Sequence, residues 1–460
     1  MTPSFTAPER ARQFAAAVQA AGGRALIVGG WVRDTLLGLP PTGEVDMEVY
    51  GLAPETLRRV LETFGRVDTV GESFTVYKVA GFDVALPRRD SKVGRGHRGF
   101  EVVGDPFMPL ADAVRRRDFT INALLCDPLT GEILDLVGGR RDLDARVLRA
   151  VDPDTFGDDS LRVLRGLQFA ARFDLAMEPA TRALCAALPL DDLASERVYA
   201  ELEKLLWRAR RPSIGLALGL ELGTIARLFP ELHALVGCPQ EPDWHPEGDV
   251  WIHTLMVIDH ARLAIDGLDR GQAMAVLLGA VSHDFGKPAT TAVIDGRIRS
   301  PNHEAAGVAP ATAFLDRLRI HTIGDVDVRR QVLGMVQYHL APGMWHKATS
   351  PVSDGAFRRL ALKVDLELLA VLARADCVGR AGEFDCSAMD WFLERARALG
   401  VEHRPPAPIL LGRHVLALGL QPGPEVGRLL KAVYERQLDG TVTSLDEAIT
   451  AARGLQDPRT

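Results

Sequence analysis

Cysteine is scarce in this chain of 460 residues and forms no recognisable framework. The five cysteines are odd in number and contain no C-x-x-C pair. Disulfide scaffolds of secreted proteins and zinc knuckles need paired, regularly spaced cysteines. We therefore expect reduced cysteines that mostly pack in the interior, and neither a disulfide framework nor a cysteine-based zinc site.

Long apolar runs are also missing. No stretch of eighteen apolar residues occurs, and the first thirty residues lack the basic-then-apolar pattern of a secretory signal. These absences argue against a helical membrane span, and we expect a cytoplasmic protein that does not bind membranes. Nothing in the sequence indicates a protein partner.

The chain has no excess of positive charge, since its formal net charge is −7. A surface that is basic all over is therefore excluded, and any contact with nucleic acid must be a local patch. Arginines do gather locally, as in Arg115–Arg117. The length predicts three or four domains around separate cores.

The stretch from Ala25 to Gly51 organises the first part of the chain. Residues 25–28 have the length and apolar character of a buried strand, and Gly29-Gly30 ends it without side chains. A short helix follows and carries Arg33. Backbone N–H groups after two glycines, together with a guanidinium, are typical of phosphate binding.

Carboxylates then alternate with apolar residues at Glu44, Asp46 and Glu48. Alternation places all three on one face of a strand, where like charges repel unless a cation lies between them. Oxygen ligands indicate Mg²⁺ or Mn²⁺. Asp83, in a later short strand, is a fourth carboxylate that can face the same site. The other interpretation is an edge strand with a solvated acidic face.

Two later segments also carry nucleotide-like chemistry. Arg117-Asp118 follows two further arginines and precedes an apolar segment, which we predict to be a helix. Asp118 there caps the helix or contributes to triphosphate binding. Asp159, Arg162 and Arg165 recur every three residues beside a leucine face. An aspartate accepts and an arginine donates, so the pair suits a nucleobase edge, although ion pairs in a first helical turn are the ordinary alternative.

Histidines gather after a proline-rich linker at 239–248. The candidates are His253, the adjacent pair His283-Asp284, His303, His339 and Asp376. Imidazole and carboxylate ligands suit a transition metal that activates water against a phosphate ester. A histidine-rich helical core is the equal alternative.

Six segments in order resemble bacterial class II tRNA nucleotidyltransferases, the CCA-adding enzymes of the poly(A) polymerase family. They are VGGWVRDTLLGL, the acidic strand, RRRDFTINALLCD, DPLTGEILDL, FGDDSLRVLRGLQFAARF and SERVYAELEKLL. WHPEGDVWIHTL, SHDFGK and RADCVGR resemble the HD phosphohydrolase domain that some of these enzymes carry. The matches extend from about residue 25 to 380.

The resemblance implies an α+β protein with a small mixed α/β palm and all-helical domains after it. The implied domains are a head and palm at 1–150, a neck and body at 151–240, an HD domain at 241–382 and a helical C-terminal region at 383–460. The implied partners are CTP, ATP and the tRNA 3′ end, with Mg²⁺ or Mn²⁺ at the palm.

The resemblance also assigns residues by position. The implied triphosphate contacts are Gly29, Gly30, Arg33 and Arg117, with Asp118 nearby. Asp159 and Arg162 would read the base, with Arg165 and Gln168 beside them. The implied HD ligands are His253, His283, Asp284 and Asp376, with His303 and His339 as further candidates.

Three positions depart from the family pattern. The usual Asp-x-Asp metal pair falls on Glu44 and Asp46, or on Asp46 and Glu48 in another register. Asp158 and Gln168 stand where glutamate and arginine are usual. CCA addition is the leading hypothesis, and CC-only addition, A-only addition and poly(A) synthesis are alternatives. From another class, an HD phosphohydrolase with an RNA-binding N-terminal domain and an inactive RNA-binding relative also remain.

Overall fold

The computed structural model describes residues 6–40, 45–70, 76–79, 81–92 and 100–456. The chain divides into two compact units, each described here by itself. Unit 1 comprises Met1–Leu205 and Ile214–Leu228, and unit 2 comprises Leu206–Ser213 and Phe229–Thr460.

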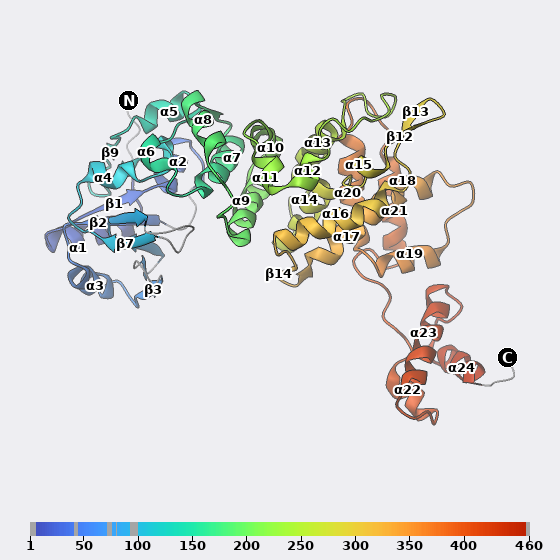
Figure 1. The fold of residues 1–460 in the computed structure, drawn as a ribbon. Helices are drawn as coiled ribbons and strands as arrows, with labels where there is room; N and C mark the ends of the chain where they lie inside the picture. The colour runs from blue at the N-terminus through green and yellow to red at the C-terminus, as the bar shows by residue number, and fades with distance from the viewer. Residues whose placement is uncertain (1–5, 41–44, 71–75, 80, 93–99, 457–460) are drawn as a thin grey trace. The chain divides into compact units, whose positions relative to one another are not determined.

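A mixed seven-stranded sheet forms the centre of unit 1 (Figure 1). Its order is β3-β4-β5-β2-β1-β8-β9. The strands are β1 (Arg24–Val28), β2 (Val45–Tyr50), β3 (Asp68–Val70), β4 (Val76–Val79), β5 (Phe82–Ala85), β8 (Leu125–Cys126) and β9 (Ile133–Leu134). Strands β6 (Arg88–Lys92) and β7 (Phe100–Gly104) form a separate hairpin-like pair. The acidic strand β2 is therefore central and not at an edge.

The two faces of the sheet carry different residues because side chains alternate along β2. Val45, Met47 and Val49 pack into a core with helix α1 (Glu9–Ala20) and helix α3 (Pro54–Glu62). The opposite face of β1 and β2 packs against helix α4 (Leu110–Arg115), where Tyr50 is buried. Asp46 and Glu48 alternate with the first set, so they belong to the face opposite the α1 core.

The segment after Arg117-Asp118 is not the apolar helix that its composition suggested. It forms a single 3-10 turn, η2 (Thr120–Asn122), and then enters the sheet as β8. Its apolar residues are buried because the segment becomes an inner strand of the sheet. A short apolar run does not by itself distinguish a helix from a buried strand.

The remainder of unit 1 is largely helical and begins near residue 139. It comprises α5 (Gly139–Asp144), β10 (Val147–Leu148), α6 (Pro153–Phe156), α7 (Leu161–Phe173), β11 (Ala176–Met177), α8 (Pro179–Ala187), α9 (Ser195–Arg208), α10 (Pro212–Glu221) and α11 (Thr224–Leu228). The leucines at 161, 164 and 167 of α7 are buried, as their three-residue spacing predicted. The face beside them carries Arg162 and Arg165.

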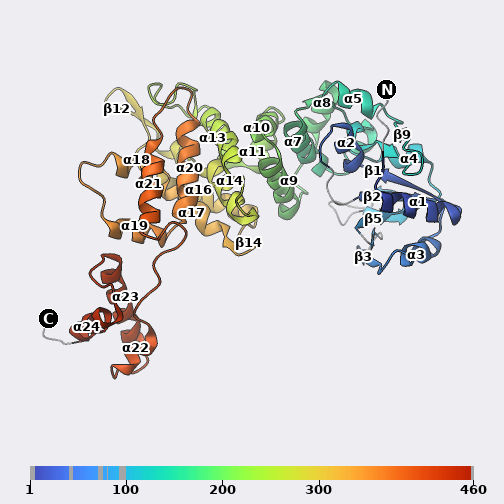
Figure 2. The same ribbon diagram turned by 180° about the vertical axis from the view of Figure 1, so that it is seen from behind.

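Unit 2 is a helical bundle (Figure 2). Its described residues also form two short antiparallel strand pairs, β12 (Ala292–Ile294) with β13 (Arg297–Arg299) and β14 (Thr322–Ile323) with β15 (Val326–Asp327). Its helices up to residue 398 are α12 (Pro230–His233), α13 (Val250–Ala264), α14 (Arg270–Ser282), α15 (Lys287–Thr290), α16 (His303–Arg317), α17 (Val328–Tyr338), α18 (Ala341–His346), α19 (Asp354–Ala361), α20 (Leu366–Val378) and α21 (Ser387–Ala398). Helix α14 is buried along almost its whole length, as expected for a helix that is apolar all round. Helices α13, α17 and α20 pack against it.

The last helices have an apolar core of their own. They are α22 (Gly412–Ala417), α23 (Pro424–Leu438) and α24 (Leu445–Gln456), and their buried residues include Val415, Val433 and Ala448. This segment of the chain is thus helical.

The cysteines depart from the prediction in one respect. Cys377 and Cys386 form a disulfide, whereas all five were expected to be reduced. The nine-residue separation gave no signal, because pairing depends on α20 turning back into α21. Cys126, Cys185 and Cys238 are free and buried, which agrees with the predicted packing role.

The mixed α/β sheet followed by helices confirms the predicted fold class. Among the residues that the structure describes, no helix combines the length and the apolar character needed to cross a membrane. The division into four domains stays a prediction.

Candidate functional site

Asp46 and Asp83 lie side by side on the central strands. Strands β2 and β5 are parallel, and the Cα atoms of Asp46 and Asp83 are register partners. Side chains in register on neighbouring strands share a face of the sheet. Asp46 is exposed, whereas Asp83 is partly exposed and its Oδ2 accepts from Nζ of Lys78 at 2.9 Å. The structure therefore brings two of the predicted carboxylates together, while Glu44 lies outside the described residues.

Glu48 shares the face of Asp46 but has a different environment. Its side chain is buried, and its Oε2 accepts from the Tyr50 hydroxyl at 2.7 Å. Arg116 pairs with Oε1, and Arg117 Nη2 lies 3.4 Å from Oε2. Burial raises the pKa of Glu48, but Arg117 and Arg116 outweigh it and leave the pKa below its usual value. Glu48 is thus an ionised partner of arginines, which argues against the Asp46–Glu48 register for the metal pair.

The Gly29-Gly30 turn leads into the seven-residue helix α2 (Gly30–Leu36). Gly29 has a φ of 70°, a conformation that favours glycine. A Cβ on Gly29 would lie 3.6 Å from Nη1 of Arg117, and one on Gly30 would lie 3.3 Å from Nη2 of Arg33. Two guanidinium groups therefore lie against this turn.

Arg33 is built into the protein interior. Its guanidinium pairs with Asp34 at 2.6 Å and donates to Oδ1 of Asn122. Its Cζ lies 4.2 Å from the ring centre of Phe173 and 5.2 Å from that of Phe169. Burial lowers the pKa of Arg33 despite the favourable charge of Asp34. With an exposure of 3%, Arg33 connects the glycine turn to α7, and its predicted contact with triphosphate stays a prediction.

Asp118 connects the η2 segment to helix α7. Its carboxylate accepts from the Phe119 N–H at 2.7 Å, Asn122 Nδ2 at 3.0 Å and Arg165 Nε at 2.7 Å. Burial raises the pKa of Asp118, but Arg165 and these hydrogen bonds outweigh it, so the pKa lies below its usual value. Asp118 is therefore an organising group, and not the helix cap that was the alternative.

Asp159 and Arg162, the predicted base-reading pair, lie at the start of α7. Asp159 Oδ2 pairs with Arg197 Nη2 at 2.8 Å. Arg162 donates to the backbone oxygens of Thr155 at 3.0 Å and Arg116 at 2.6 Å. Both side chains remain partly exposed, so each is held in place while keeping a surface that another molecule can contact.

Gln168, further along α7, is buried with an exposure of 2%. Within the described part of the chain, its Oε1 has no hydrogen-bond partner. Gln168 thus lies inside the protein next to the arginine network, and its predicted nucleotide contact stays a prediction.

The histidine cluster of unit 2 is assembled from five helices. His253 comes from α13, His283-Asp284 follow α14, His303 begins α16, His339 follows α17, and Asp376 lies in α20. All six residues are buried. His253 Nε2 lies 3.0 Å from Asp376 Oδ1, and His303 Nε2 lies 3.3 Å from Asp284 Oδ1. Every predicted HD residue is therefore brought to one place.

The orientation of the rings points to metal coordination. Nδ1 of His283, His303 and His339 each lies 2.9 Å from a backbone carbonyl oxygen. Such a bond fixes the proton on Nδ1 and leaves the Nε2 lone pair for a metal. Nε2 of His303 and Nε2 of His339 then face each other at 3.3 Å. Burial, followed by the charges of His283 and His303, lowers the pKa of His339 to about 3, which keeps this ligand neutral.

Two groups of three side chains have ligand atoms within 4.8 Å of one another in this cluster. One is His253, His283 and Asp376, and the other is Asp284, His303 and His339. Opposed lone pairs and buried carboxylates with no cation between them would repel, so the donor set fits a bound metal ion.

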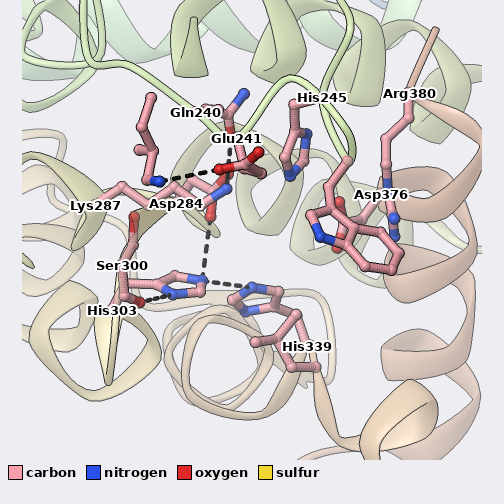
Figure 3. Close-up of a pocket in the computed structure, with 13 residues that line it drawn as sticks. Gln240, Glu241, His245, Asp284, Lys287, Ser300, His303, His339, Asp376 and Arg380 are labelled. Carbon is pink, nitrogen blue, oxygen red and sulfur yellow. Dashed lines mark hydrogen bonds and ion pairs between the residues drawn. The ribbon is translucent and has the colours of Figure 1, made fainter. Parts of the chain in front are cut away.

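A cavity of about 280 Å³ opens onto these residues (Figure 3). Asp284, His303, His339 and Asp376 are among the residues that line it. Two cationic side chains, Lys287 and Arg380, line it too, and Lys287 Nζ lies 2.8 Å from Asp284 Oδ2. The cavity thus offers positive charge next to the cluster, as a phosphate ester requires.

Comparison with known proteins identifies the family of the chain. A model of the Poly A polymerase head domain matches residues 25–149. A multifunctional CCA protein of Xanthomonas campestris pv. campestris (strain B100) is 36% identical over 422 residues, which cover 88% of this chain and 95% of that protein. The chain belongs to the multifunctional CCA protein family. The resemblance read from the motifs is therefore confirmed.

Solved structures show that this family member has the fold of CCA-adding enzymes. The Bacillus stearothermophilus CCA-adding enzyme in complex with CTP is 22% identical with a TM-score of 0.65, and the match covers 99% of this chain and 98% of that one. The Thermotoga maritima CCA-adding enzyme complexed with tRNA is 18% identical with a TM-score of 0.58, over 98% and 97% of the two chains. At these identities the likeness concerns the fold alone.

Several partners of the site residues in this family member were missed by sequence reasoning. Arg197 holds Asp159, and Glu247 Oε1 lies 2.9 Å from Nδ1 of His253. Lys287 was visible in the sequence three residues after Asp284, a spacing that places both on one side of a helical turn. Arg197 and Glu247 carried no such signal, because their partners lie in other elements.

Proposed function

We propose that this protein adds CCA to the 3′ end of tRNA from CTP and ATP, without a nucleic-acid template. The observation that carries the proposal is a continuous network in unit 1. It joins the strand of Asp46 to the arginines beside the glycine turn, and these to the helix of Asp159 and Arg162. The contacts thus join the strand, the turn and the helix to which we assign metal binding, phosphate binding and base reading.

The acidic strands supply the proposed Mg²⁺ site. Asp46 and Asp83 would hold the ion, with Glu44 as the third carboxylate. Their oxygen donors suit Mg²⁺ or Mn²⁺. When bound, such an ion neutralises triphosphate charge and lowers the pKa of the attacking hydroxyl.

The proposed base reading uses the complementary groups at the start of α7. The Asp159 carboxylate accepts from an exocyclic amino group, which both cytosine and adenine carry. The Arg162 guanidinium donates to ring nitrogen or carbonyl oxygen. Uracil and guanine present other donor and acceptor patterns at that edge, so they would leave a charged group unpaired.

Replacing Asp46 by Asn tests the proposed metal role. Because a neutral amide replaces the negative carboxylate, metal binding should weaken. We expect incorporation of labelled CTP and ATP into tRNA lacking its 3′ end to fall by at least about 1,000-fold. Asp68→Asn, on the exposed strand β3, is the matched control and should retain activity. Full incorporation by the Asp46 variant would overturn the metal assignment.

The extent of addition is tested with the same assay. CTP alone, ATP alone and both nucleotides are offered to tRNAs that end before each of the three additions. We expect all three steps. Arrest after CC, addition of A only, or long adenosine tails would each identify one of the alternative activities and contradict complete CCA addition.

We also propose that the HD cluster binds a transition metal and hydrolyses phosphate esters. The support is the convergence of histidine ring nitrogens and buried carboxylates beside a cavity lined by Lys287 and Arg380. When bound, the metal would provide an activated water. Lys287 and Arg380 would neutralise the phosphate oxygens.

The test uses a 2′,3′-cyclic nucleotide with added Ni²⁺, Co²⁺ or Mn²⁺. His283→Ala should abolish hydrolysis because it removes a ligand, while His321→Ala, an exposed histidine of unit 2, should not. Hydrolysis that survives in His283→Ala would contradict the assignment. So would a wild type that does not hydrolyse the cyclic nucleotide with any of the three metals. Since its proposed substrate is tRNA, we place the protein in the cytoplasm.

A further inference from the structure

Glu48 is buried beneath the arginines of the proposed nucleotide site, whereas Asp46 on the same strand is exposed. It lies two residues after Asp46 on β2 and is the register partner of Leu26 on β1. Its exposure is 2%, and the Tyr50 beside it is buried against α4. Both carboxylate oxygens already have protein partners, since Oε1 pairs with Arg116 and Oε2 with Tyr50 and Arg117.

Arg117 is held at the glycine turn by these contacts. Its Nη2 lies 3.4 Å from Glu48 Oε2, and its Nη1 lies 3.4 Å from the backbone oxygen of Asn122. The same Nη1 is the nearest side-chain atom to the position a Cβ on Gly29 would take. Glu48 and Asn122 therefore fix a guanidinium beside the turn, where its exposed side can face an anion.

Arg116 extends the connection to the base-reading helix. Its side chain pairs with Glu48, and its backbone oxygen accepts from Arg162 Nη2 at 2.6 Å. The Glu48 carboxylate thus contacts both arginines. Arg117 is itself a predicted triphosphate ligand, and Arg116 contacts Arg162, a predicted base-reading residue. Glu48 also neutralises one of two adjacent positive charges, so the pair keeps a net charge of about +1.

We propose that Glu48 is a positioning residue for nucleotide binding, which orders Arg116 and Arg117 so that Arg117 meets the triphosphate and Arg162 meets the base. This inference rests on the proposed nucleotidyl transfer. It assigns Glu48 to binding through arginines, in contrast to Asp46, whose proposed role is at the metal. Tyr50 supports Glu48 by donating to the oxygen that also faces Arg117.

The decisive variant is Glu48→Gln, which keeps the shape of the side chain but removes its charge. We expect the Kd of CTP and of ATP, measured by calorimetry, to rise about tenfold, and KM with it. The kcat at saturating nucleotide and the half-saturating Mg²⁺ concentration should change by less than about threefold, because no metal ligand is lost. Tyr50→Phe, which removes only one hydrogen bond, should raise both Kd values by about two- to threefold.

A double variant separates positioning from general weakening. Because Glu48 also holds Arg116, adding Glu48→Gln to Arg117→Ala should still raise the Kd, but by clearly less than the tenfold or so expected when Arg117 is present. The melting temperature of each variant shows that it is folded. Unchanged Kd values in a folded Glu48→Gln would overturn the proposal, and so would a large loss of kcat with a shifted Mg²⁺ dependence. If the wild type neither binds nor incorporates CTP and ATP, the proposed function fails instead.

Discussion

Arg33 illustrates how a single residue changes its meaning once its surroundings are known. In the sequence it is an arginine after two glycines, the position of a phosphate ligand. In the structure it is 3% exposed, paired with Asp34 and enclosed by the rings of Phe169 and Phe173. A charge that is buried and paired stabilises its surroundings only while its partners are present.

Arg33→Leu should therefore destabilise unit 1. It removes the closest partner of buried Asp34, so the free energy of unfolding should fall by about 3–5 kcal/mol. Urea unfolding followed by tryptophan fluorescence measures the change. Arg58→Ala is the control, because its ion pair with Glu62 is exposed and should contribute no more than about 0.5 kcal/mol. Equal stability of the two variants would contradict the buried role.

At the level of elements, close approach of helices places the HD ligands. Gly286 lies between the His283-Asp284 pair and α15, and it contacts the start of α16. A Cβ at this position would lie 2.0 Å from the backbone oxygen of His303 and 2.6 Å from the nitrogen of Gly307. His303 can approach Asp284 only because residue 286 has no side chain.

Gly286→Ala should consequently displace α16 and carry His303 away from the cluster. Overpacking of this kind costs about 1–3 kcal/mol, and we expect at least about a tenfold loss of metal-dependent hydrolysis. Metal titration and hydrolysis of the cyclic nucleotide measure the effect. Gly343→Ala, in helix α18 where the new Cβ meets nothing within 4 Å, should leave both unchanged. Retained hydrolysis in the Gly286 variant would show that the helices can adjust.

At the level of the whole molecule, each proposed site is built within one unit. The side chains around Asp46, Arg117 and α7 belong to unit 1, and those around His283 belong to unit 2. The pairs that define each site join residues of the same unit, so a substitution in one site leaves the contacts of the other intact.

The two active-site variants should therefore be complementary. Asp46→Asn should hydrolyse the cyclic nucleotide at a rate within about twofold of wild type, and His283→Ala should add nucleotides within about twofold, because sites that share no residue act independently. Both assays are run on the same full-length preparations. Loss of both activities in either variant would indicate that the units depend on each other.

The sequence alone was sufficient for patterns that depend on neighbouring residues. The alternation around Asp46 and the buried leucines of α7 follow from local spacing, and the structure agrees with both. The order of motifs also identified the family. Local periodicity is informative here because a strand or a helix imposes its own repeat on the side chains.

Only the tertiary structure decided which members of a pattern share an environment. Alternation treats Asp46 and Glu48 alike, yet one is exposed and the other is buried under Arg116 and Arg117. His253 Nε2 and Asp376 Oδ1 lie 3.0 Å apart although 123 residues separate them in the sequence. The Cys377–Cys386 disulfide depends on a turn that the spacing of the two cysteines did not predict. Depth and long-range contact depend on how elements pack against one another, and packing is a property of the folded chain as a whole.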